Sequence, residues 1–191
     1  YKTMDATEIH NLAELKAFCK AGGQPDYLFF WGHHPRSPGV VDKSCLSNWF
    51  PAGFEVDGHW YFTSEHYLMA QKAWLFEDAH AFEQIRLSED PAEAKEWGRR
   101  VNNFDESLWL LKRWEYNLQA NYQKFSQNPE LKTFLLGTGS QVLVGASPVD
   151  SIWGIGLAAS DSHARQPENW KGLNLLGFAL MEVRSRLASA L

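Results

Sequence analysis

Apolar residues recur at helical spacing towards the end of the chain. In residues 171–187 they lie three or four positions apart, which predicts an amphipathic helix with one buried face: Leu176, Leu180, Val183 and Leu187. Other helices are predicted from Asp5 to about residue 22, from the Asp90-Pro91 start signal, over 108–125, and after Pro129.

Short apolar and aromatic runs predict strands between these helices. Strands are expected at 27–31 and 141–144, and Asp57-Gly58 predicts the turn of a hairpin between 54–56 and 59–61. The predicted strands and helices do not alternate in the way that a parallel βαβ sheet requires. We therefore expect an α+β fold, a mostly helical single domain of residues 1–191 around a small β-sheet, with the 5–22 helix as an appendage.

The segment from Thr63 to Lys72 places two ionisable groups on one helical face. Glu65 and Lys72 are seven residues apart, so their side chains point in directions within roughly 20° of each other. Leu68 and Met69 lie between them, and an apolar surrounding shifts the ionisation of both groups, as acid–base or Schiff-base chemistry requires. The alternative is a solvent-exposed charged pair on an amphipathic helix. Ser64 is expected to cap this helix.

Composition narrows the functional classes. The net charge of −5 over 191 residues argues against a broad basic face for duplex DNA. The two cysteines form no CxxC pair, no run approaches about 20 apolar residues, and the first residues resemble no secretory leader. We therefore expect a cytoplasmic protein that does not bind a membrane. No metal site is expected either, because adjacent histidines such as His33-His34 rarely share one ion. No cofactor motif is found.

A glycine-rich turn near residue 150 is another polar cluster. Asp150 is followed by Trp153, Gly154 and Gly156, and Asp161 lies beyond them. Glycines at this spacing allow a backbone to pass close to a ligand, although an ordinary turn needs the same residues.

These clusters, taken in order, resemble the NADAR (YbiA-like) family of N-glycosidases from about Phe29 to Leu187. The motifs that carry the resemblance are LSNW (46–49), SEHY (64–67), AQK (70–72), KF (124–125), LLGTG (135–139), SPVD (147–150), WGIG (153–156), GLNLLG (172–177) and LMEVR (180–184). Each motif is weak alone, but their common order and spacing make the resemblance specific.

The resemblance implies hydrolysis of a bond between ribose and nitrogen, in early riboflavin intermediates that carry ribose phosphate. The expected catalytic residues are Glu65, Lys72 and Asp150, because a carboxylate stabilises an oxocarbenium-like sugar and an amine can attack an opened ribose aldehyde. The expected substrate-binding residues are Asn48, Trp49, Trp153, Gly154, Gly156, Asp161, Trp31 and Arg36. Arg86, Arg99 and Lys124 are alternatives to Arg36 as donors to a phosphate.

Two other functions are compatible with the same motifs. One is an ADP-ribosyl-guanine hydrolase acting on nucleic acid, which the acidic net charge does not favour. The other is a catalytically silent ADP-ribose or nucleotide-binding module. Gly145 supports the silent module, because members of the family commonly carry an acidic residue at this position.

Overall fold

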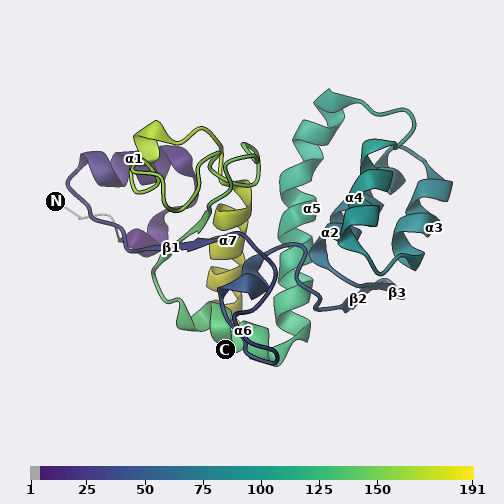
Figure 1. Ribbon diagram of the computed structural model, residues 1–191, viewed down its shortest axis with the longest axis horizontal. Helices are drawn as coiled ribbons and strands as arrows, with labels where there is room; N and C mark the ends of the chain where they lie inside the picture. The colour runs from purple at the N-terminus through teal and green to yellow at the C-terminus, as the bar shows by residue number, and fades with distance from the viewer. Residues whose placement is uncertain (1–4) are drawn as a thin grey trace. The chain divides into compact units, whose positions relative to one another are not determined.

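The computed structural model describes residues 5–191, and its chain groups into two compact units (Figure 1). One unit combines the residues up to Gly32 with Thr133–Leu191, and the other is His33–Lys132. Helices and short strands occur in both units, which confirms the predicted α+β class. In place of one small sheet, residues 5–191 form two separate two-stranded sheets, one in each unit. That residues 1–191 form a single domain stays a prediction.

The first unit is built on a parallel strand pair. Strand β1 (Tyr27–Phe30) pairs with β4 (Val142–Gly145), with Tyr27 opposite Val142. Helix α7 (Leu175–Ser189) packs against β4, and its four predicted core residues are all buried. The remaining elements are η1 (Ala6–Glu8), α1 (Leu12–Lys20), η3 (Pro167–Asn169) and most of α6 (Pro129–Gly137).

Two predicted helices of this unit begin later than expected. Residues 5–22 are not one helix: Asp5 caps only η1, the extended backbone of Ile9 follows, and Asn11 caps α1. Burial of the Ile9 side chain explains the break, because it holds residue 9 in an extended conformation that a continuous helix would not allow. Helix α7 begins only after Asn174, whose left-handed backbone (φ 52°) is not helical.

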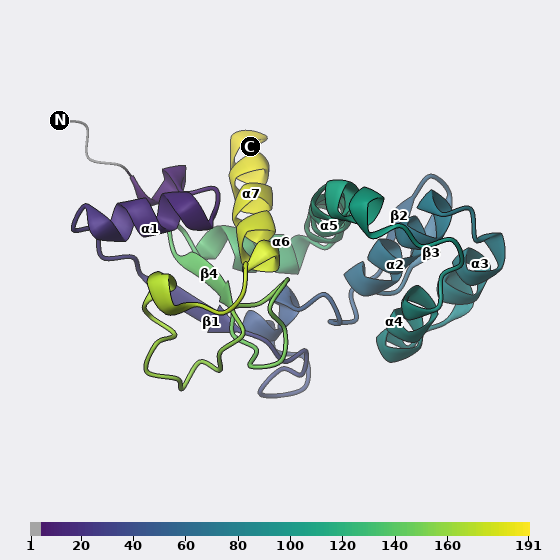
Figure 2. The same cartoon turned by 90° about the horizontal axis from the view of Figure 1, so that it is seen from above.

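The second unit is a group of helices beside a hairpin. Helix α2 (Ser64–Leu75) packs on α3 (Ala79–Leu87), α4 (Pro91–Arg99) and α5 (Glu106–Gln127), as Figures 1 and 2 show. The predicted hairpin is confirmed: β2 (Phe54–Val56) and β3 (His59–Tyr61) are antiparallel. Its two turn residues both have positive φ, as a type I′ turn requires. Before β2, the chain forms η2 (Lys43–Leu46).

The prediction that Ser64 caps α2 is wrong by one residue. Thr63 has the extended backbone of a cap, and its hydroxyl oxygen accepts a hydrogen bond from the His66 N–H at 3.2 Å. Ser64 is the first helical residue, and Glu65 follows in the first turn.

Candidate active site

Glu65 lies at the start of α2 and is only 9% exposed. Its backbone N–H donates to the carbonyl of Asn48 at 3.0 Å, which joins the helix start to the loop before it. Because Thr63 provides the cap, the helix does not depend on a carboxylate at position 65 to begin. The alternative of a fully solvent-exposed charged pair is therefore wrong, since Glu65 is buried.

Lys72 lies on the same helix, as predicted, and is partly buried. Its ammonium is 4.7 Å from the ring centroid of Phe104 and 5.4 Å from that of Trp109. Burial lowers the pKa of Lys72 below its usual value, while the negative charge of Glu65 acts in the opposite direction. The charge of Glu65 therefore acts on the ionisation of Lys72.

Asn48 is held by a buried group of three amides. Its Nδ2 donates to Oδ1 of Asn117 at 2.9 Å, and its Oδ1 accepts from Nδ2 of Asn121 at 3.1 Å. Sequence reasoning missed Asn117 and Asn121. The available signal was their spacing of four residues within the predicted 108–125 helix, which puts two amides on one face of it.

His66 follows Glu65 in the chain and is completely buried. Its Nδ1 lies 2.7 Å from the Thr63 hydroxyl, and its Nε2 has no hydrogen-bond partner among residues 5–191. Burial lowers the pKa of His66 to about 4, so the imidazole is neutral near pH 7. A completely buried, neutral side chain suits a structural role better than a role as acid catalyst.

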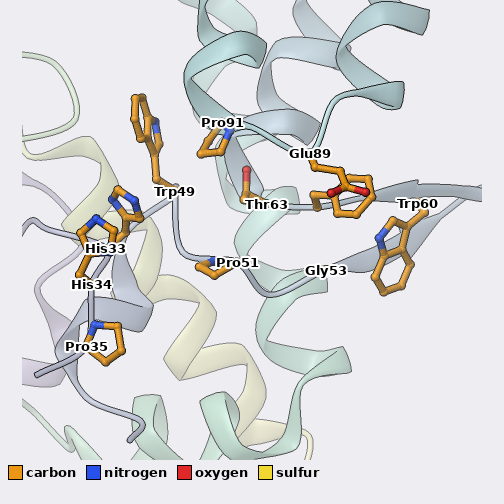
Figure 3. A pocket seen from close by; sticks show the side chains of 11 residues that line it. His33, His34, Pro35, Trp49, Pro51, Gly53, Trp60, Thr63, Glu89 and Pro91 are labelled. Atoms are coloured by element: carbon orange, nitrogen blue, oxygen red, sulfur yellow. The ribbon is translucent and has the colours of Figure 1, made fainter. Parts of the chain in front are cut away.

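A pocket of about 490 Å³ opens in the second unit (Figure 3). Some of its lining residues are close in sequence to Asn48 and Glu65. Trp49 and Thr63, which line it, are the chain neighbours of Asn48 and Ser64. The full lining is His33, His34, Pro35, Trp49, Pro51, Gly53, Trp60, Phe62, Thr63, Glu89 and Pro91. The rings of His33 and Trp49 are 5.7 Å apart, and burial lowers the pKa of His33. Glu65 and Lys72 do not line this pocket.

The four candidate phosphate donors have different surroundings. Arg36 is exposed, and its side chain makes no ion pair within residues 5–191. Arg86 and Arg99 each pair with a glutamate of their own helix, at 3.1 and 3.5 Å. Lys124 is fully buried and donates to main-chain carbonyls, so it is not available to a phosphate. Arg36 is therefore the least committed of the four.

In the first unit, the carboxylate of Asp150 closes a turn. Its Oδ1 accepts the backbone N–H groups of Ile152 and Trp153, both at 2.9 Å. The Asp150 carbonyl accepts the N–H of Gly156 at 3.0 Å. One carboxylate oxygen of this predicted catalytic residue thus already serves the local fold.

The two predicted binding glycines are required by packing of the chain on itself. A Cβ on Gly154 would lie 2.7 Å from the carbonyl oxygen of Gly145 and 3.1 Å from that of Asp150. Gly156 has a φ of 71°, a left-handed conformation that favours glycine. The ordinary-turn interpretation therefore accounts for both glycines without a ligand.

Gly145 lies at the end of β4 in close contact with the same turn. A Cβ there would lie 3.1 Å from the carbonyl oxygen of Trp153 and 3.2 Å from the Cα of Gly154. An acidic side chain would need the turn to move by a few tenths of an ångström. Gly145 therefore also has a structural reason, because the neighbouring turn leaves little room for a side chain at this position.

The other predicted residues of this unit differ in exposure. Trp153 is half-buried, while Trp31 is 39% exposed. Asp161 is exposed, and its Oδ1 accepts the N–H of His163 at 2.8 Å. That these side chains and those of the second unit act in one site stays a prediction.

Within residues 5–191, no group of three or more His, Cys, Asp or Glu residues is placed to hold a metal ion. Nor does this part of the chain contain a helix of the length and apolarity needed to cross a membrane.

Comparison with known proteins agrees with the motif order. The NADAR domain matches residues 29–188. The chain belongs to the NADAR domain family. The match covers the motifs from LSNW to LMEVR and agrees with the core predicted at about 29–187, so the predicted family is confirmed.

Two named relatives and one solved structure show how far the likeness extends. N-glycosidase R617 of Acanthamoeba polyphaga mimivirus is 42% identical over 164 residues, which are 83% of this chain and 94% of that protein. N-glycosidase YbiA of Escherichia coli K12 is 37% identical over 152 residues, covering 77% and 83%. The NMR structure of the E. coli protein YbiA matches 97% of this chain and 93% of its own, with 30% identity and a TM-score of 0.70. The names of these curated relatives support the predicted class of enzyme.

Proposed function

We propose that this NADAR protein hydrolyses the ribose–nitrogen bond of phosphorylated ribosyl-heterocycles, such as early intermediates of riboflavin synthesis. The observation that carries the proposal is the buried Glu65 at the start of α2. Lys72 lies on the same helix, and the charge of Glu65 acts on the pKa of Lys72. The family of named N-glycosidases supplies the reaction class.

The proposed reaction uses Glu65 to stabilise positive charge. As the bond to nitrogen breaks, the anomeric carbon becomes oxocarbenium-like, and a carboxylate in a poorly hydrated site stabilises it more strongly than in water. A water molecule then adds to the anomeric carbon and loses a proton, while the leaving nitrogen gains one. The products are ribose phosphate and the free heterocycle.

Lys72 has two possible roles in this reaction. As an amine, it adds to C1 of the ring-opened ribose, which is still joined to the heterocycle nitrogen as an iminium. The C1–nitrogen bond then breaks, the heterocycle leaves with the proton of the amine, and water hydrolyses the imine that remains on Lys72 to the aldehyde of ribose phosphate. As an ammonium, it orients Glu65 and the sugar hydroxyls. The lowered pKa of Lys72 supports the first role, and the charge of Glu65 supports the second. Of the two, we propose the covalent route.

The remaining roles concern substrate binding. Asn48 keeps one N–H and part of its Oδ1 for a ribose hydroxyl or a base edge, because each of its two ends makes one bond to α5. In the pocket of about 490 Å³, Trp49 is proposed as a stacking surface for the heterocycle. Arg36 is the proposed hydrogen-bond donor to the phosphate. Trp31, Trp153, Gly154, Gly156 and Asp161 are proposed to complete the substrate site, with Asp150 as a further acid–base group.

The experiment is an assay of purified protein with an aminouracil ribotide, in which released ribose phosphate and heterocycle are separated and quantified. Stoichiometric release of both products supports the proposal. Release of ADP-ribose from ADP-ribosylated guanine in nucleic acid, with the ribotide intact, would instead identify the second function. Binding of ADP-ribose without turnover of either substrate would identify a silent module, for which Gly145 is the supporting feature.

A further inference from the structure

Helix α5 directs three polar side chains into the protein from one face. Asn117, Asn121 and Lys124 follow each other at spacings of four and three residues, so they lie one above another on that face. All three are 0% exposed. Buried amides and amines cost free energy unless they find partners, so such a stripe needs an explanation.

Outside α5, these side chains bind mainly one short loop. Within α5, Asn121 Nδ2 also donates to the carbonyl of Asn117 at 3.0 Å, and Asn117 Nδ2 has no hydrogen-bond partner among residues 5–191. Asn117 and Asn121 bind the two ends of the Asn48 amide, at 2.9 and 3.1 Å. Lys124 donates through Nζ to the carbonyl of Ser47 at 2.9 Å and also to that of Cys45. The stripe therefore holds both the main chain just before Asn48 and the plane of its amide.

The same loop is joined to the start of α2. The carbonyl of Asn48 accepts the N–H of Glu65 at 3.0 Å, and the Ser64 hydroxyl lies 3.5 Å from Oδ1 of Asn121. A displacement of the loop would be passed to Glu65 through its own backbone. The stripe itself cannot touch a substrate, because none of its three side chains reaches the surface.

We propose that Asn117, Asn121 and Lys124 are positioning residues that set the amide plane of Asn48 and the place of Glu65 for catalysis. This inference rests on the proposed function, since it assigns those two residues to the reacting site. It also explains why a helix whose other buried residues include Leu118, Ala120 and Phe125 places three polar groups on its buried side. Burial lowers the pKa of Lys124 to about 7, which reduces the cost of keeping this amine away from water.

The test is a double-mutant cycle between Asn121 and Asn48. Asn121→Ala should lower kcat/KM by about 10- to 100-fold, the order expected when a reacting group is misplaced. The same substitution in an Asn48→Ala background should have an effect of less than about threefold, because its route of action is already lost. Equal losses in both backgrounds would overturn the proposal.

A matched control separates positioning from general stability. Ala120→Gly alters a neighbouring buried residue of α5, lowers helix stability and removes none of the hydrogen bonds between the three asparagine side chains. At the same loss of Tm, it should keep kcat/KM within about threefold of wild type. If Asn121→Ala does not fold, Asn121→Ser, which keeps a small polar group, replaces it in the cycle.

A second readout does not depend on activity. Side-chain amide NMR signals of Asn48 should show slowed hydrogen exchange in wild type and in Ala120→Gly, and fast exchange in the Asn121 variant. Unchanged exchange in that variant would overturn the positioning role. A wild-type protein with the slow signals but no turnover would contradict the proposed function alone.

Discussion

The start of α2 and the turn at residues 150–156 both carry predicted site residues, but the fold uses their polar groups differently. In the turn, one oxygen of Asp150 binds two backbone N–H groups, and Gly154 and Gly156 are required by packing and backbone conformation. On α2, the cap is Thr63, and the bond that Glu65 makes to Asn48 uses its backbone.

Of the two regions, the start of α2 holds the better candidates for chemistry. A buried ionisable group is costly to the fold, so one that local structure does not require needs another explanation. On α2, Glu65 is buried and Lys72 is partly buried, and Thr63 rather than either of them caps the helix. The turn residues already have a structural explanation, and any catalytic role for them is an addition to it.

The largest expected effect is that of Glu65→Gln, which keeps the shape of the side chain and removes its charge. If the carboxylate faces the developing cation, turnover should fall by about 10²–10⁴-fold, while Tm changes little. Steady-state kinetics and thermal unfolding measure both quantities. A variant that keeps more than about a third of wild-type turnover would remove Glu65 from the chemistry, because that loss is under 1 kcal/mol.

The second prediction concerns the ionisation of Lys72. Burial lowers its pKa, so the neutral amine becomes available at a lower pH than for an exposed lysine, and a covalent route should speed up as pH rises through that lowered pKa. Borohydride added during turnover should then trap a sugar adduct on Lys72, detectable by mass spectrometry. Lys72→Arg, which keeps the charge but cannot form an imine, should lose about 10²-fold or more of turnover.

The opposite outcome would assign Lys72 to orientation. An ammonium that only orients Glu65 yields no adduct, and its activity falls as pH rises. Substantial activity in Lys72→Arg would rule out the covalent route even if an adduct were trapped in wild type.

A third prediction tests the packing explanation of the turn. Gly154→Ala brings a Cβ to within 2.7 Å of the Gly145 carbonyl oxygen, so the turn must shift, at a cost of about 1–3 kcal/mol in unfolding free energy. Chemical denaturation measures this loss. Gly137→Ala is the matched control, because its Cβ meets nothing within 4 Å, and it should not destabilise the protein. Equal effects of the two substitutions would contradict the packing explanation.

The smallest expected effect separates the two roles of Asp150. Asp150→Asn keeps an oxygen that can accept from Ile152 and Trp153, so its stability should stay close to wild type, whereas Asp150→Ala should lose about 1 kcal/mol. We expect turnover of Asp150→Asn within about tenfold of wild type, as for an auxiliary acid–base group. A loss as large as that of Glu65→Gln would place Asp150 at the centre of the reaction and remove the contrast between the two regions.

Local signals in the sequence determined much of the secondary structure. The Asp57-Gly58 hairpin, the Asp90-Pro91 helix start and the buried face of α7 follow from turn chemistry and spacing, and all are confirmed. These features depend on neighbours within a few residues, which is why a sequence alone reveals them. Motif order likewise identified the family, and the placement of Glu65 and Lys72 on one helix face followed from helical geometry.

Long-range contacts were decided only in the tertiary structure. The parallel pairing of β1 with β4 joins strands more than a hundred residues apart, and no local pattern encodes it. The burial of Lys124 and its bonds to the loop before Asn48 likewise join residues 77 and 79 positions apart. In sequence, Lys124 is one more candidate cation for a phosphate. Its buried surroundings make it part of the framework, because the ionisation and availability of a side chain depend on what the folded chain packs around it.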